Sequence, residues 1–367
     1  MSKRTIILLV IATLAIAVAA ALWWLTRPLP VLTVTTWPGP YARAQANAMF
    51  HPFGEEARVD VREAEYDGGL EHLRDEVRTR NYDWDVIDLE LADAVRACSE
   101  GLLARIDARA LPAAANGVAA RADFLPFANG PCWVGSAVYG QVIAYASTRL
   151  APHPLLAQDF FDLKKFPGGR GLRRGSPKLN LELALLADGV PPENIYPLLE
   201  TSAGVDRALA KLASIRDSIV WWSRAPDALG LLEDRRATMT TAFNGDVFDA
   251  QVHGRHIGVI WNDQLDELDV FGIPKGDPRR DLSLAFIEYA TGTKPLARAA
   301  EWLPYGPARR SALAFVGKNP ETGMRMLPYL PTAPANAATA FAVDDVWWLR
   351  HGHDIAPAWE AFLNRTR

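Results

Sequence analysis

The sequence is short of several features that mark particular classes of protein. Its 367 residues contain only two cysteines, which excludes a small domain built on many disulfides. Only one apolar stretch, at residues 6–25, is long enough to span a bilayer, so a membrane protein with several spans is excluded. Lys and Arg (39) do not outnumber Asp and Glu (43), and the net charge of −4 argues against a nucleic-acid binder. What remains, 49% hydrophobic and 22% charged, is typical of a globular protein with roughly two or three domains.

The amino terminus has the pattern of an export signal. Lys3 and Arg4 precede the apolar stretch, as in the charged and apolar regions of a signal peptide. Its alanines would suit signal peptidase, whereas its length would also let it remain in the membrane as an anchor. We therefore expect an exported, periplasmic protein in which residues 1–28 are either a cleaved signal peptide or a retained transmembrane helix.

Export bears on the two cysteines. Cys98 and Cys132 both lie beyond the apolar stretch, and in an oxidising compartment a single pair of cysteines can form one disulfide. Such a bond would close a loop of about 35 residues and contribute about 3–4 kcal/mol. We expect this disulfide, with two buried free thiols as the alternative.

After the export segment, strand patterns and helix patterns alternate. Residues 31–37 alternate and are rich in β-branched side chains, residues 41–50 have helical spacing, and residues 58–63 return to a strand pattern. This order predicts a βαβ unit with parallel strands. Residues 219–261 show a second unit of similar design, and the long β-rich run at 133–147 could cross between the two units.

In the carboxyl-terminal third, the sequence patterns predict short strands and short helices. Strand patterns occur at 257–261 and 268–274, with acidic residues between them that are typical of a solvated turn. Helical patterns occur at 346–350 and 355–364, and the histidine-containing segment between them is expected to be a loop.

These patterns predict an α/β protein of two lobes that are joined by extended segments, with a ligand site between the lobes. We expect the first lobe to comprise residues 29–142 and a return segment at 268–325, and the second lobe to comprise residues 143–267. Residues 326–367 are expected to form a carboxyl-terminal helical cap.

Seven segments, which together span most of the chain after the export segment, carry a family resemblance. The chain resembles the substrate-binding proteins of ABC importers, of the spermidine/putrescine-binding type. The resemblance implies a type II-like periplasmic-binding-protein fold with a ligand cleft between two lobes, no enzymatic activity and no cofactor. The segments are TTWPGPYARAQ (35–45), DWDVIDLE (83–90), KKFPGGRGLRR (164–174), IVWWS (219–223), TTAFNGDVFDA (240–250), LDVFGIPKG (268–276) and LPYGP (303–307).

A protonated polyamine needs aromatic faces for its methylenes and ammonium groups, and carboxylates for its N–H donors. By resemblance, Trp37 and Tyr41 after the first strand line the ligand site, as does Tyr305. The resemblance also implies that Phe243 covers the ligand while Asp246 binds an amine. The alternatives are that Trp37 is a core residue and that Asp246 caps a helix.

Further acidic and aromatic residues complete the predicted site. Asp269 matches the family acid that binds the other amine, and Glu267 stands where the family has an aromatic residue. The alternative for both is that they are solvated carboxylates of an acidic turn. Glu90 ends the third strand, Glu182 lies near a family acid, and Trp222 could face the cleft.

Other functional classes find little support in the sequence. None of the histidines belongs to a set with zinc-ligand spacing, Ser136 lacks the G-x-S-x-G pattern of a hydrolase, and the glycine-rich segment 168–175 lacks the Lys-Ser/Thr ending of a phosphate loop. We expect no metal, and we interpret segment 168–175 as a basic surface loop on which a transporter could dock.

We therefore predict that the protein captures a small cationic solute, such as putrescine or spermidine, by hinge closure. It would then deliver this solute to an inner-membrane ABC permease. One alternative is another amine or amino-acid-like solute. The others are a periplasmic enzyme or a membrane-tethered sensor on the same scaffold.

Overall fold

The computed structural model describes residues 13, 15, 16 and 27–365. The predicted signal peptide or anchor, residues 1–28, therefore lies almost entirely outside the described residues. Within the described part of the chain, no helix is long and apolar enough to cross a membrane.

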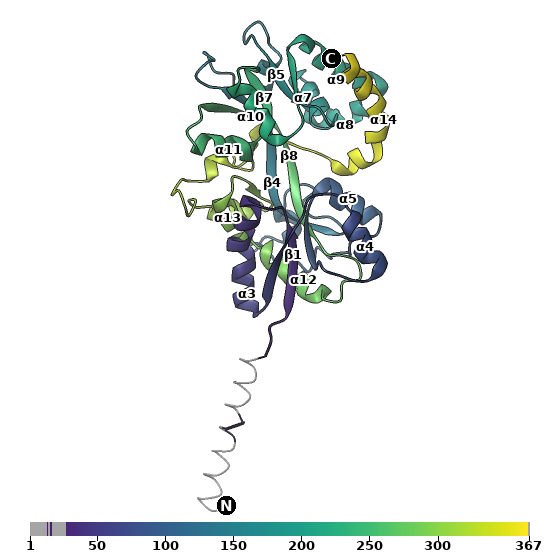
Figure 1. Ribbon diagram of the computed structural model, residues 1–367, viewed down its shortest axis with the longest axis vertical. Helices are drawn as coiled ribbons and strands as arrows, with labels where there is room; N and C mark the ends of the chain where they lie inside the picture. Colours follow the sequence, from purple (N-terminus) through teal and green to yellow (C-terminus); the bar gives the residue numbers. More distant parts are fainter. Residues whose placement is uncertain (1–12, 14, 17–26, 366–367) are drawn as a thin grey trace, which may run out of the picture.

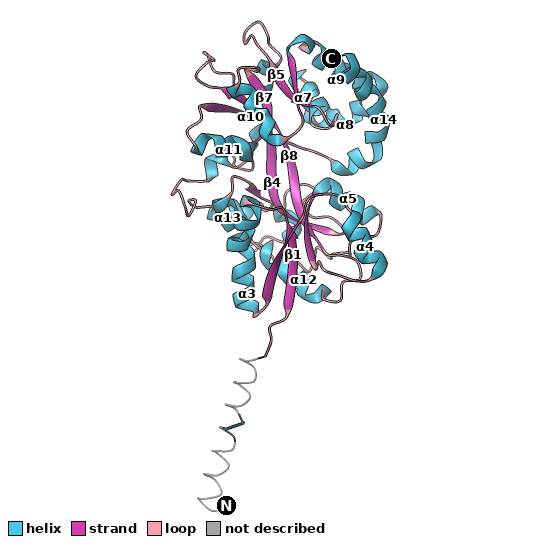
Figure 2. Cartoon of the chain, viewed as in Figure 1, coloured by secondary structure: helices cyan, strands magenta, loops and turns pink. Residues whose placement is uncertain are grey.

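The described chain forms two lobes that share one mixed β-sheet (Figures 1 and 2). The strand order is β2-β1-β3-β8-β4-β7-β5-β6. The long strands β4 (Trp133–Ala146) and β8 (Ile257–Gly272) pair antiparallel and run through both lobes. The short strands β9 (Gly306–Pro307) and β10 (Phe341–Ala342) pair with β4 and β8. This arrangement confirms the predicted two-lobe α/β fold.

The first lobe is built on three parallel strands. These are β1 (Val31–Thr36), β2 (Asp60–Glu65) and β3 (Val86–Glu90), with β1 in the middle. Alternation of apolar residues along β1 buries Leu32 and Val34 completely. The flanking helices are α2 (Pro40–Gln45), η1 (Ala46–Phe50), α3 (His51–Ala57), α4 (Glu71–Thr79), α5 (Leu91–Ser99), α6 (Ala120–Asp123), α12 (Arg280–Ala290), α13 (Thr293–Trp302) and η5 (Arg310–Phe315).

The two cysteines of the first lobe are joined. Cys98 at the end of α5 and Cys132 just before β4 form a disulfide bond, with their Cα atoms 5.9 Å apart. The bond ties the start of the long strand β4 to a helix of the same lobe.

The second lobe repeats the design with three parallel strands. Strand β5 (Arg170–Arg173) lies between β6 (Ile219–Trp222) and β7 (Met239–Phe243). Two apolar clusters pack around this part of the sheet. The helices of this lobe are η2 (Ala157–Phe160), α7 (Asn180–Ala187), η3 (Pro192–Asn194), α8 (Ile195–Leu199), α9 (Ser202–Ala213), η4 (Arg216–Ser218), α10 (Ala225–Glu233) and α11 (Asn244–Val252).

The carboxyl terminus returns to the second lobe. After η6 (Leu327–Tyr329) and η7 (Ala337–Thr339), helix α14 (Asp345–Arg365) packs its tryptophans Trp347 and Trp359 into the core of that lobe. Its start also contacts α5 of the first lobe.

Two element predictions were wrong. The strands expected at 257–261 and 268–274 are one strand, β8, because residues 265–267 between them pair with β4, and 265–266 also with β10, while residues 261–264 lie at a register shift. The helices expected at 346–350 and 355–364 are one helix, α14. His351 stacks on Trp347 with ring centroids 4.7 Å apart, which favours a continuous helix across the expected loop.

Candidate functional site

Carboxylates gather where β3 and β8 meet between the lobes. Glu90 at the end of β3 lies directly opposite Asp269 of β8 in the antiparallel register. Asp88 precedes Glu90 by two residues, and Glu267 precedes Asp269 by two. Like charges placed directly opposite each other destabilise a sheet. We refer to Asp88, Glu90, Glu267 and Asp269 as the acidic cluster.

Asp88 is fully buried, and hydrogen bonds hold its carboxylate in place. Its carboxylate accepts hydrogen bonds from the Tyr41 hydroxyl (3.0 Å), the Ser136 hydroxyl (3.1 Å) and the Gln45 side-chain amide. Ser136 reaches Asp88 from a bulge, since the register between β4 and β8 shifts at this residue. Burial raises the pKa of Asp88 to about 7, although these hydrogen bonds favour its ionised form.

Asp269 and Glu90 also hold protons more tightly than usual. Burial, followed by the charges of Asp88 and Glu90, raises the pKa of Asp269 well above its ordinary value. The pKa of Glu90 is raised to about 7, first because the surrounding protein removes part of its hydration and second by the charge of Glu267. Its side chain nevertheless remains accessible to solvent. Neither carboxylate forms an ion pair with any residue that the structure describes. The two carboxylates are therefore available to a cation from outside the protein.

Aromatic rings form a row from the first lobe to the second. The ring centroids are 5.7 Å apart for Tyr41 and Tyr305, 5.9 Å for Tyr305 and Tyr139, 5.7 Å for Tyr139 and Phe243, and 6.3 Å for Phe243 and Trp222. Tyr139 was not among the predicted site residues, although it lies directly opposite Glu267 in the register of β4 and β8. The row places aromatic faces beside the acidic cluster.

The contact between Tyr305 and the second lobe depends on residues that follow Phe243. Asn244 accepts a hydrogen bond from the Gly140 amide (2.9 Å) and donates one to the Pro304 carbonyl (2.6 Å), which holds the start of α11 against the segment before Tyr305. A Cβ atom on Gly245 would lie 2.9 Å from the Tyr305 ring. Glycine at this position therefore allows Tyr305 to pack against α11.

Asp246 lies in the first turn of α11, but it does not act as the predicted capping alternative. The helix has no side-chain cap hydrogen bond, and within the described chain Asp246 has no ion-pair partner. Burial raises the pKa of Asp246, and its charge in turn helps to raise the pKa of Tyr305, after burial and the charge of Asp269. Asp246 therefore adds a second-lobe carboxylate close to the aromatic row.

Arg173 is a basic residue that the sequence analysis did not assign to the site. It ends β5, and its guanidinium carbon lies 5.7 Å from the centre of the Phe243 ring. No acidic residue in the described part of the chain forms an ion pair with it. The sequence analysis places Arg173 in a basic surface loop, whereas the structure places it at the carboxyl end of a parallel strand, where ligands of open α/β sheets bind.

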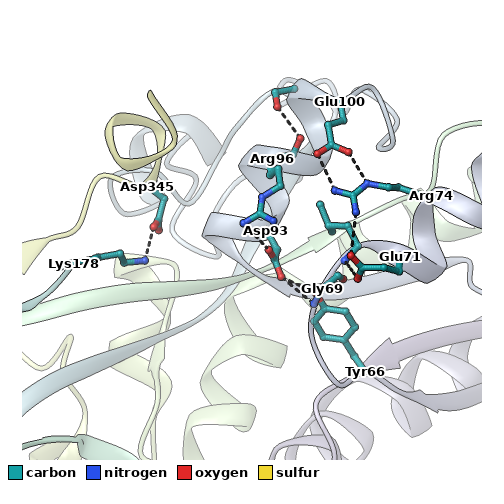
Figure 3. A network of polar contacts seen from close by, with 11 residues as sticks. Tyr66, Gly69, Glu71, Arg74, Asp93, Arg96, Glu100, Lys178 and Asp345 are labelled. Atoms are coloured by element: carbon teal, nitrogen blue, oxygen red, sulfur yellow. Dashed lines mark hydrogen bonds and ion pairs between the residues drawn. The ribbon is translucent and has the colours of Figure 1, made fainter. Parts of the chain in front are cut away.

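Lys178 is a second basic residue that the sequence analysis missed. Its ammonium nitrogen lies 2.5 Å from Glu267 Oε1 and 2.5 Å from Asp345 Oδ1. Figure 3 shows Lys178 beside Asp345 at the start of α14. Glu267 is 5% exposed and paired with Lys178, so the alternative of a solvated turn residue does not describe it.

Trp37 lies at the edge of this region, within the first lobe. Its ring packs edge-on against Tyr66 at 4.7 Å, and its buried indole N–H has no hydrogen-bond partner among the described residues. Tyr66 donates hydrogen bonds to Asp93 and to the Gly69 carbonyl, as Figure 3 shows. Its hydroxyl also lies within the field of Glu90. Trp37 is therefore half-buried beside the acidic cluster, outside the aromatic row.

The structure places Glu182 away from the cluster, in the core of the second lobe. One carboxylate oxygen accepts from the Leu179 amide (2.8 Å), and the other accepts from the Trp348 indole (2.6 Å) and the Tyr196 hydroxyl (3.4 Å). Burial raises the pKa of Glu182 to about 7. Its oxygens are used to start α7 and to hold α14 in place.

One group of possible metal ligands occurs elsewhere in the described residues, at His72, Glu76 and Asp83. One oxygen of Glu76 already accepts hydrogen bonds from the Asp83 and Trp84 amides, at 2.7 and 2.9 Å. These bonds give Glu76 a structural role at the turn before β3.

Comparison with known proteins shows the family. Residues 48–324 match the family described as bacterial extracellular solute-binding protein. The chain is 35% identical over 334 residues to a γ-aminobutyric acid (GABA)-binding protein of Pseudomonas aeruginosa, covering 91% of each protein. These matches are to solute-binding proteins and not to enzymes.

Solved structures support the same assignment. A GABA receptor, Atu4243, superposes with a TM-score of 0.74 and 26% identity, over 90% of this chain and 97% of its own. The spermidine/putrescine-binding protein PotD of Streptococcus pneumoniae superposes with a TM-score of 0.69 over 91% of this chain and 99% of its own. Its 14% identity means that it shares the fold alone, so the narrower resemblance to polyamine-binding proteins is not confirmed. The chain belongs to the bacterial extracellular solute-binding protein family of ABC transporters.

Proposed function

We propose that this protein binds a small solute with one ammonium group and one carboxylate, such as γ-aminobutyric acid. The observation that carries the proposal is that acidic and basic side chains without ion-pair partners among the described residues both lie beside the aromatic row. In the described chain, Asp269 and Glu90 form no ion pair and neither does Arg173, although the charge of Arg173 is felt at Glu90. A zwitterionic amine would compensate both. The relatives with GABA in their names support this ligand class.

The ammonium group of the solute would lie against the acidic cluster. A buried ammonium requires ionised, hydrogen-bonded carboxylates, because otherwise its loss of hydration is not recovered. Asp269 and Glu90 would supply them, while the neighbouring faces of Tyr41 and Tyr305 would add cation–π contacts of about 0.5–2 kcal/mol each. The bound cation would also remove the repulsion between Glu90 and Asp269.

The carboxylate of the solute would bind Arg173. A guanidinium presents parallel N–H donors that match the two oxygens of a carboxylate. Phe243 already lies against this guanidinium and limits its orientations. Arg173 lies in the second lobe and the acidic cluster lies at the first, so one solute would contact both lobes.

These contacts suggest how binding would be signalled. A solute that contacts both lobes favours the closed arrangement over the open one by its difference in affinity for the two. The strands β4 and β8, which run through both lobes, would carry the hinge. We propose that an inner-membrane ABC permease recognises the closed form in the periplasm. Tethering by residues 6–25 stays a prediction, because most of that segment lies outside the described residues.

A polyamine is the second candidate, favoured by the number of carboxylates around the aromatic row and by the sequence resemblance. The two candidates differ at Arg173, which would attract the carboxylate of an ω-amino acid and repel the second ammonium of a diamine. The positive charges of Arg173 and Lys178 in this region favour the ω-amino acid.

Binding of candidate solutes to the exported, purified protein tests the proposal. Thermal unfolding should be followed with GABA, other ω-amino acids, putrescine, spermidine and a neutral sugar. A solute present at 100 times its dissociation constant adds about 2.7 kcal/mol to the free energy of unfolding. We expect this stabilisation from GABA or a related ω-amino acid. Stabilisation by putrescine or spermidine alone would support the second candidate, and no response to any amine would refute both.

A further inference from the structure

A buried lysine of the protein already occupies one end of the acidic cluster. Lys178 lies just before α7, and its ammonium nitrogen lies 2.5 Å from a carboxylate oxygen of both Glu267 and Asp345. The side chains of Lys178, Glu267 and Asp345 are 17%, 6% and 2% exposed. The three groups come from three separate segments, so tertiary folding alone brings them together.

Glu267 is part of the site and not a remote surface acid. It lies two residues before Asp269 on β8, so the two side chains share one face of the strand. It also lies opposite Tyr139 of the aromatic row. Its charge raises the pKa of Glu90, second only to the effect of burial. Without Lys178, Glu267 would be one more unpaired carboxylate next to Asp269 and Glu90.

We infer that Lys178 acts as a built-in ammonium group that fills the position of a second ligand amine, so that the site selects monoamines over diamines. The inference rests on the proposed function, because it concerns the same site. The ε-ammonium of lysine is the same chemical group as the end of a diamine such as putrescine. A diamine would need a free carboxylate beyond Asp269 and Glu90, and Glu267 is already paired.

Positive charge next to this position strengthens the selection. A second ligand ammonium at Glu267 would lie beside Lys178, and both Lys178 and Arg173 are close enough for their charges to act on Glu90. Repulsion of the wrong ligand is as effective for specificity as attraction of the right one. The ligand carboxylate of an ω-amino acid has the opposite charge and meets no such penalty.

Lys178 also holds the start of α14 through Asp345, and a purely structural role must be distinguished from selection of the ligand. Two double variants, Lys178→Gln/Asp345→Asn and Lys178→Gln/Glu267→Gln, make this distinction. Each keeps the net charge that Lys178, Glu267 and Asp345 have together in the wild type. The first leaves Glu267 as a free carboxylate, whereas the second leaves Asp345.

Dissociation constants for putrescine and GABA should be measured by calorimetry for the wild type and both variants. We expect Lys178→Gln/Asp345→Asn to shift the preference towards putrescine by about tenfold or more, the scale of a new charge-assisted contact. The matched variant Lys178→Gln/Glu267→Gln should show no such shift. Lys178→Arg, which keeps the positive charge, should retain the preference of the wild type.

The outcomes separate this inference from the proposed function. A wild type that binds no ω-amino acid refutes the proposed function, yet a gain of putrescine binding in the first double variant would still support the role of Lys178. If both double variants keep the wild-type ratio, or lose affinity for both ligands equally, Lys178 is structural and the inference is wrong. Circular dichroism should verify that each variant is folded.

Discussion

Glu182 and Asp269 are both buried carboxylates with a raised pKa, yet their surroundings differ in one respect. Glu182 lies in the second-lobe core, where Leu179, Tyr196 and Trp348 donate hydrogen bonds to its two oxygens. Asp269 lies between the lobes, opposite Glu90, and no ion-pair partner for it occurs in the described chain. Glu182 has donors at both oxygens, whereas Asp269 has the Tyr41 hydroxyl beside it but also the charges of Asp88 and Glu90. Burial alone therefore does not mark a ligand site, whereas a buried carboxylate next to other acids and without an ion-pair partner does.

The largest expected effect is on ligand binding. Asp269→Asn should weaken binding of the amine by about 30-fold or more, because loss of one partner from a buried charge pair costs about 2–5 kcal/mol. The free protein should not lose stability, because the substitution removes repulsion from Glu90 and Asp88. Calorimetry and urea unfolding measure the two effects. Normal binding by this variant would mean that the ammonium subsite is misplaced.

Glu182→Ala should have the opposite profile. It leaves the Trp348 indole and the Leu179 amide without a buried acceptor, so the free energy of unfolding should fall by about 2–4 kcal/mol. The dissociation constant of the ligand should stay close to that of the wild type. Glu182→Gln is the matched control, since it retains an acceptor oxygen and should lose less stability. A loss of affinity with unchanged stability would place Glu182 in the ligand site after all.

Arg173→Gln should separate the two classes of ligand. Binding of an ω-amino acid should weaken by roughly 10- to 100-fold, because the carboxylate loses a charge-assisted partner. Binding of putrescine should be unchanged or tighter. Arg173→Lys keeps the charge but not the paired donors, so its affinity for an ω-amino acid should lie between those of the wild type and Arg173→Gln. Equal effects on both ligands, measured by calorimetry, would argue against a carboxylate subsite at Arg173.

The smallest expected effect is that of pH. Because the pKa values of Asp88 and Glu90 are raised to about 7, the native state binds more protons than the unfolded state between about pH 4 and 7. Stability of the free protein should therefore fall as the pH rises through this range. Affinity for an ammonium ligand should have the opposite pH dependence: it should decrease as the pH drops below about 7, because the carboxylates are then protonated.

Calorimetry in buffers of different ionisation enthalpy measures the protons that are released on binding at pH 7. Glu182 also has a pKa of about 7, but it should keep its proton occupancy when the ligand binds. The Glu182→Gln variant should therefore release as many protons as the wild type. Binding heats that do not depend on the buffer would show that the acidic cluster is already ionised.

Part of the site could be predicted because its residues follow strands in recognisable motifs. Tyr41, Phe243, Asp246 and Tyr305 each lie near the end of a strand or in a short motif, and the structure brings three of them to the aromatic row or its edge. Glu182 had a similar local pattern but lies in a core. A motif gives the position of a residue along its own element, and it carries no information on which distant donors surround the side chain.

The basic residues could not be predicted for the same reason. Arg173 and Lys178 lie in a segment rich in glycine and basic residues that is typical of a surface loop. Their roles depend on Phe243, Glu267 and Asp345, which are far away in the sequence. Likewise, the polar residues in the middle of β8 have the pattern of a turn, and the pairing of Asp266 and Glu267 with β4 keeps the strand continuous.

The two α/β units, the long connecting strand and the excess of acids and aromatic residues at strand ends can be predicted from the sequence, because these depend on local periodicity and turn residues. Which of those acids are left without an ion-pair partner depends on the tertiary structure. It placed Glu90 opposite Asp269, gave Glu182 its hydrogen-bond donors and paired Glu267 with Lys178. The physical reason is that compensation of a buried charge depends on distances between segments far apart in the chain, and local sequence does not encode them.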